Sequence, residues 1–108
     1  MRVVCKICVN LTLFLIVIMG AHTRAESDGQ EFLNFLKNSN TRVVAMAHID
    51  DVWKKWDGTL FCMQITDIDR KSEMAASAVE FYLEQNPDQH FRPRRYLIIQ
   101  ALRTKFPC

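Results

Sequence analysis

Glycine, histidine and cysteine are all scarce in this sequence of 108 residues, which has three glycines, three histidines and four cysteines. Beyond residue 25 the only glycines are Gly29 and Gly58, so this part of the chain has no glycine-rich loop of the kind that holds phosphate groups. The histidines and cysteines fit no zinc-ligand spacing, and we expect His48 and His90 to be structural. We therefore expect no metal, no cofactor and no enzymatic activity.

The first 25 residues are typical of a secretory signal peptide. Arg2 and Lys6 precede an apolar stretch at positions 11–19, and Thr23 and Ala25 supply small side chains before a cleavage site. The stretch is shorter than the roughly 20 apolar residues that span a membrane. We therefore expect residues 26–108 to be a single small domain, secreted to the extracellular space, with no stable membrane association.

Removing the signal peptide changes the charge of the protein. The whole chain has a formal net charge of +2, but residues 1–25 contain three basic and no acidic residues. The exported part has eleven basic and twelve acidic residues, which is a formal charge of −1. The composition therefore gives no support to a nucleic-acid-binding function.

Only two cysteines, Cys62 and Cys108, remain after export. Small secreted domains commonly contain disulfides, because their hydrophobic cores are marginal. An intramolecular bridge is the simplest expectation and would stabilise the fold by about 4 kcal/mol on the chain-entropy model. A different partner for each cysteine is the alternative.

The pattern of apolar residues predicts one short helix followed by strands. Residues 28–37 have a capping-box pattern at Asp28 and Glu31 and an apolar stripe at helical spacing. Residues 41–53 are rich in apolar and β-branched side chains, and residues 59–68 follow the turn signal Asp57-Gly58. These two segments predict an antiparallel hairpin.

The rest of the chain is less clear. Residues 72–85 fit a half-buried strand at period two, and they also fit a helix with an apolar stripe of Met74, Ala78, Phe81 and Tyr82. Residues 86–93 are expected to be a loop, and residues 94–105 a last strand. Within these two segments, positions 92–95 form a basic patch that could contact an acidic partner, although a solvated loop is the simpler interpretation.

Aromatic residues are numerous for so short a chain. Their rings can hold a cation by cation–π contact while a carboxylate pairs with an ammonium group, which is what an amine-binding pocket needs. Filling a small core is the other explanation. The rings considered for such a pocket are those of Trp53, Trp56, Phe61, Phe81, Tyr82 and Tyr96.

The order of these elements resembles the beginning of the tick salivary lipocalins, a histamine-binding family. Cys62-Met63-Gln64, then Glu80-Phe81-Tyr82, then Cys108 follow an order and spacing similar to those of that family. The sequence departs from the family pattern at Met63, Gln64 and Phe81. Residues 26–108 also contain no Asn-x-Ser/Thr sequon, and they are too few for an eight-stranded barrel.

The resemblance implies a mainly β fold, with a short N-terminal helix and a partial lipocalin-like antiparallel sheet. It also implies that the protein sequesters a biogenic amine or a similar small molecule, so that its partner is a small-molecule amine or a hydrophobic ligand. Glu80 would pair with the ammonium group and Tyr82 would contact the ligand, with Trp53 and Trp56 nearby. The alternative is a cystatin-like α+β fold, or an accessory interaction protein without a ligand pocket.

Overall fold

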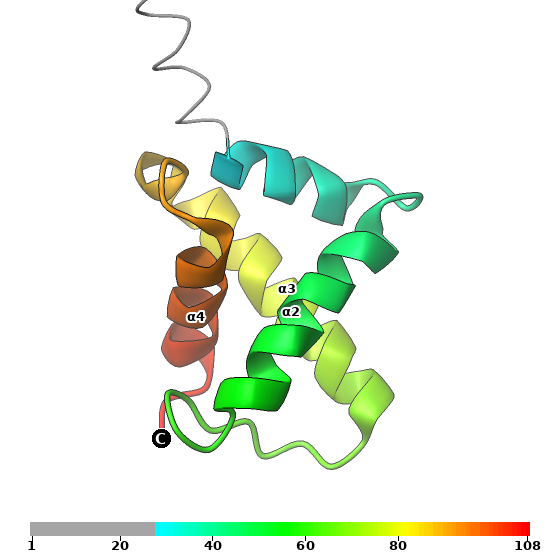
Figure 1. The fold of residues 1–108 in the computed structure, drawn as a ribbon, viewed down its shortest axis with the longest axis vertical. Helices are drawn as coiled ribbons and strands as arrows, with labels where there is room; N and C mark the ends of the chain where they lie inside the picture. The colour runs from blue at the N-terminus through cyan, green and yellow to red at the C-terminus, as the bar shows by residue number, and fades with distance from the viewer. Residues whose placement is uncertain (1–27) are drawn as a thin grey trace, which may run out of the picture.

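A computed structural model describes residues 28–108, and most of this part of the chain is helical. Figure 1 shows α2 and α3 crossing each other, α4 beside them, and the first helix lying across one end. Each pair among α2, α3 and α4 is in contact. The elements in chain order are a helix at residues 28–37, α2 (Arg42–Trp56), α3 (Ile68–Gln85), the short 3-10 helix η1 (Pro87–Gln89) and α4 (Arg94–Lys105).

The predicted fold class is wrong. The expected mainly β fold and its cystatin-like α+β alternative both need an antiparallel sheet, and residues 28–108 contain none. An isolated bridge between Asp57 and Phe61 is the sole β-type pairing in this part of the chain. The barrel-like sheet implied by the lipocalin resemblance is therefore absent from the described residues, and the domain is all-helical.

Two predicted strands are helices. Residues 41–53 were expected to be extended because of their β-branched side chains, but Arg42–Trp56 forms α2. Its buried residues Ala45, Ile49 and Val52 recur at intervals of three and four positions, which places them on one face of a helix. Residues 94–105 form α4 for the same reason, since their buried side chains follow a helical interval. Those side chains are Leu97, Ile98, Ala101 and Leu102.

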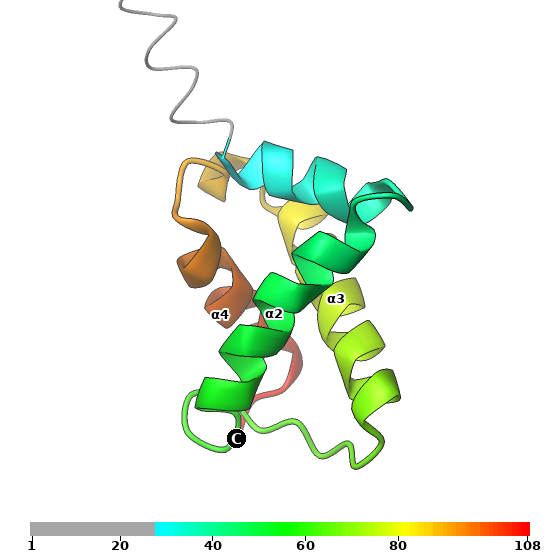
Figure 2. The ribbon, with the colours of Figure 1, turned by 45° about the vertical axis from the view of Figure 1, so that its right-hand side comes forward.

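The predicted second strand of the hairpin is not a strand. Residues 58–67 form a turn followed by extended chain that connects α2 to α3 (Figure 2). Gly58 adopts a φ of 89°, in the left-handed region that favours glycine, so the turn predicted at Asp57-Gly58 is present. It closes a loop after a helix and does not join two strands.

The ambiguous segment at residues 72–85 is part of α3. The helix begins after Asp67, whose side chain accepts a hydrogen bond from the Asp69 backbone N–H at 3.1 Å. Its buried residues include Ala76, Val79 and Leu83, which lie on one face at helical spacing. The helical pattern therefore outweighs the period-two alternation that the same residues also show.

The helix predicted at residues 28–37 is confirmed. Phe32, Leu33 and Leu36 are buried in the core, as the apolar stripe indicated. The carboxylates of Asp28 and Glu31, expected to cap the helix, both bind the guanidinium of Arg94, at 3.1 and 2.5 Å. This pairing joins the first helix to the start of α4.

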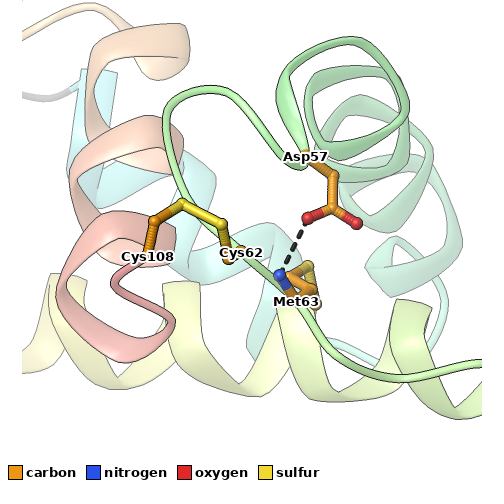
Figure 3. Close-up of a disulfide and its surroundings, with 4 residues drawn as sticks. All are labelled: Asp57, Cys62, Met63 and Cys108. Carbon is orange, nitrogen blue, oxygen red and sulfur yellow. Dashed lines mark hydrogen bonds between the residues drawn. A yellow bond between two sulfur atoms is a disulfide. The ribbon is translucent and has the colours of Figure 1, made fainter.

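Cys62 and Cys108 form a disulfide, as expected, with a Cα–Cα distance of 4.8 Å (Figure 3). The bond joins the loop after α2 to the segment after α4. A backbone hydrogen bond runs beside it, from the Cys62 N–H to the Phe106 carbonyl at 2.8 Å. Cys62 and Cys108 are 46 positions apart in the sequence. The segments that contain them are therefore held together both by the disulfide and by a main-chain hydrogen bond.

Asp57 fixes the path of the same loop. One carboxylate oxygen accepts a hydrogen bond from the Met63 N–H at 2.8 Å (Figure 3), and the other forms an ion pair with Lys71 at 2.5 Å. Burial alone would raise the pKa of Asp57, but the Lys71 ammonium and the Met63 N–H together hold it below its ordinary value. Asp57 thus connects the end of α2 to α3.

We expect Asp57→Asn to lower the free energy of unfolding by about 1–2 kcal/mol at pH 7. Because the folded-state pKa of Asp57 is depressed, its contribution is fully present above the unfolded-state pKa, near 4, and is lost as the pH falls through the folded-state pKa. Urea unfolding at pH 7, 5 and 3 measures this. The difference between wild type and variant should shrink at pH 3. A constant difference at all three pH values would contradict the assignment.

The predicted signal peptide, residues 1–25, lies outside the described residues. Among residues 28–108, no helix combines the length and apolar character needed to cross a membrane. Secretion stays a prediction.

Candidate functional site

A groove of about 770 Å³ lies between α3 and α4. This volume is within the range of about 300–1,000 Å³ found for small-molecule sites. Its walls are mainly apolar, with polar groups at a few positions. The lining residues are Glu73, Met74, Ser77, Ala78, Phe81, Tyr82, Gln85, Asn86, Ala101, Thr104 and Lys105.

Helical periodicity explains why α3 supplies most of the lining. Met74, Ala78, Phe81 and Tyr82 recur every three or four residues, so they occupy one stripe, beside the stripe that packs into the core. Phe81 is 64% exposed, although it is one of the largest apolar side chains on the helix. Most of the Phe81 ring is therefore not packed against the rest of the chain. Exposed apolar surface of this kind often marks an interaction site, so the groove is a candidate binding site.

Two charged side chains lie on opposite walls of the groove. Glu73, on α3, accepts a hydrogen bond from the Arg42 guanidinium at 2.7 Å. Lys105, on α4, forms no ion pair with any residue of the described chain 28–108. The Glu73 carboxylate is thus already paired with a cation, whereas the Lys105 ammonium is available to pair with a ligand.

Tyr82 supplies the groove with a phenol ring. Burial, followed by the nearby charges of Tyr96 and Asp88, raises the pKa of the Tyr82 hydroxyl above its ordinary value. The hydroxyl is therefore neutral at physiological pH and can donate or accept a hydrogen bond. Asn86, which also lines the groove, donates its side-chain amide to the Tyr82 carbonyl at 2.8 Å and ends α3 there.

Of the four ligand-binding residues predicted from sequence, the structure places only Tyr82 in this groove. Glu80 is not among the lining residues, and it accepts a hydrogen bond from Arg42 at 2.9 Å. Trp53 is buried, and its indole N–H donates to Asp50 at 2.7 Å. Trp56 is half-buried against the core. The four side chains do not converge on one cavity.

The sequence contained a usable signal for the groove. Met74, Ala78, Phe81 and Tyr82 make up the stripe that the helical interpretation of residues 72–85 gives, and all four line the groove. Lys105 had no such signal, because its position depends on how α4 packs against α3. Residues distant in sequence come together here only through the tertiary fold.

His90 has a structural role in this fold. His90 is buried, and its Nε2 lies 2.7 Å from the Leu83 carbonyl, which it reaches as a donor. Its own carbonyl accepts a hydrogen bond from the Gly29 N–H at 2.7 Å, so His90 connects the first helix to the end of α3. Within residues 28–108, no three His, Cys, Asp or Glu side chains are grouped as metal ligands. No protein-family model, curated protein or solved structure matches this chain.

Proposed function

We propose that this chain is a secreted binding protein that holds a small amphipathic molecule in the groove between α3 and α4. The observation that carries the proposal is the apolar groove of about 770 Å³, with Phe81 exposed in its wall. Burying apolar surface contributes about 25 cal/mol per Å², so a ligand with an apolar body gains most of its affinity from these walls. The few polar groups at the rim would orient it.

Charge favours a ligand with an acidic group over the amine suggested by the sequence. Arg42 donates to both Glu73 and Glu80, so Glu73, the one carboxylate in the lining of the groove, already has a cationic partner. Lys105, on the facing wall, can pair with a carboxylate at one end of a ligand. The proposed ligand class is therefore an alkyl or aryl carboxylic acid of modest size.

Titration of residues 26–108 with decanoate, decanol and decylammonium below their micellar concentrations tests this proposal. We expect decanoate to bind about tenfold more tightly than decylammonium, which corresponds to about 1.4 kcal/mol. Lys105→Gln should reduce the affinity for decanoate toward that for decanol. Isothermal calorimetry measures all three affinities without a reporter group.

Ser77→Trp is the steric test, because Ser77 is an exposed residue that lines the groove. A bulky ring there should lower the affinity for decanoate at least about tenfold. Ala47→Trp, at an exposed position on α2 outside the groove lining, is the matched control and should bind normally. If none of the three compounds binds, or if Ser77→Trp binds as well as Ala47→Trp, the groove is not the site.

A further inference from the structure

Charge is divided unevenly along the exported chain. Residues 26–91 contain six basic and twelve acidic residues, a formal charge of −6, whereas residues 92–108 contain five basic and no acidic residues. The second segment comprises α4 and its two flanks. A protein whose exported form carries a net charge of −1 therefore has one strongly basic helix.

Two of the four basic side chains of α4, Arg95 and Arg103, lie on one stripe of the helix. At about 100° per residue, Arg95, Ile99 and Arg103 fall within about 80° of one another around the helix, and the two arginines are about 12 Å apart along it. The opposite side of α4 packs into the core. Arg95 and Arg103 are exposed, whereas Ile99 between them is half-buried against the core.

Arg92 extends the row beyond the start of α4. Its guanidinium lies 5.1 Å from the centre of the Tyr96 ring and 4.8 Å from that of the Phe91 ring. Tyr96 is 38% and Phe91 50% exposed, so the cation and both rings are presented at the surface. Stacking restricts the arginine and lowers the entropy lost when it binds a partner. We call Arg92, Arg95 and Arg103, with Tyr96, the α4 cationic row.

Ion pairing does not account for the cationic row. Arg94, which points to the first helix, is paired with Asp28 and Glu31. By contrast, within residues 28–108 the three arginines of the row form no ion pair. Arg95 also lies in the first turn of α4, where positive charge opposes the helix dipole. Arg103, in the last turn, complements the dipole, but Arg92 and Arg95 gain neither an ion pair within residues 28–108 nor a favourable dipole contact.

We propose that the α4 cationic row binds a linear polyanion, specifically a sulfated polysaccharide. Arginine is suited to this because its planar guanidinium makes paired hydrogen bonds to an oxyanion. A chain laid along α4 meets the three exposed arginines in succession, so their spacing along the helix favours a linear partner. This site is separate from the groove and does not depend on it.

Heparin-affinity chromatography and calorimetry with heparin on residues 26–108 test the proposal, because this form contains every residue of the described fold. The wild type should bind despite its net negative charge. The triple variant Arg92→Gln/Arg95→Gln/Arg103→Gln should lose about 100-fold in affinity at 0.1 M NaCl and show a weaker salt dependence. Circular dichroism establishes that the variant is folded.

The matched control is Lys54→Gln/Lys55→Gln/Arg70→Gln, which removes the same charge from exposed positions on α2 and α3. It should lose less than about threefold. Equal losses in the two triple variants would show that total charge, and not the row, determines binding. Tighter binding to vesicles containing anionic lipid, or to duplex DNA, than to heparin would overturn the assignment of the partner.

Discussion

Replacing Cys62 and Cys108 by serine is expected to lower the free energy of unfolding by about 4 kcal/mol. The bridge closes a separation of 46 residues, so breaking it greatly increases the conformational freedom of the unfolded chain. The total stability of small domains is about 5–15 kcal/mol. The loss is therefore a large fraction of what holds the fold together, and the melting temperature should fall by about 20 °C.

Urea unfolding with and without reductant measures the contribution of the bridge. The wild type should be strongly destabilised by reductant, whereas the double serine variant should be insensitive to it. The backbone hydrogen bond from Cys62 to Phe106 remains possible in the variant, so the change reports on the covalent link. A loss below about 1 kcal/mol would show that the reduced chain keeps the loop in place without the bridge.

Phe61→Ala is expected to cost about 3–5 kcal/mol. Phe61 lies in the loop after α2, yet its side chain is fully buried, with 0% exposure. It belongs to the same core as Trp53 and Leu102, so truncation leaves a cavity at a point where the loop meets the helices. Thermal and urea unfolding followed by circular dichroism measure the loss.

The adjacent residue provides a matched control for this substitution. Leu60 is in the same loop and is 38% exposed. Leu60→Ala removes a similar apolar side chain from a position with less burial, and we expect a cost below about 1 kcal/mol. Equal effects at positions 60 and 61 would mean that the loop contributes little to the core.

The sequence predicted the first helix correctly and failed where β-branched residues are frequent. At residues 28–37, the capping-box pattern and the apolar stripe of Phe32, Leu33 and Leu36 both favour a helix. At α2, Val43 and Val44 suggested a strand, but both are exposed, and the helix is fixed by Ala45 and Ile49 in the core. Burial in the folded protein decides between helix and strand here. The preference of individual residues for strands does not reveal which side chains will be buried.

The candidate site was only partly predictable for a related reason. Tyr82 was expected to contact a ligand together with Glu80, on the assumption that both lie on one face of a strand. On a helix, residues two apart point about 200° away from each other. Glu80 accordingly faces Arg42, while Tyr82 lines the groove. The correct neighbours of Tyr82 were available at intervals of three and four residues once the segment was known to be a helix.

The disulfide also determines whether proteolytic cleavage separates the chain into two pieces. The bond joins positions 62 and 108, so all of α3, η1 and α4 lie inside the covalent ring that it closes. A single cleavage anywhere between these two positions leaves both fragments attached to each other. The nicked chain keeps its two pieces at a high effective concentration, and the helices can remain packed. Separating them requires a second cut or reduction of the bond.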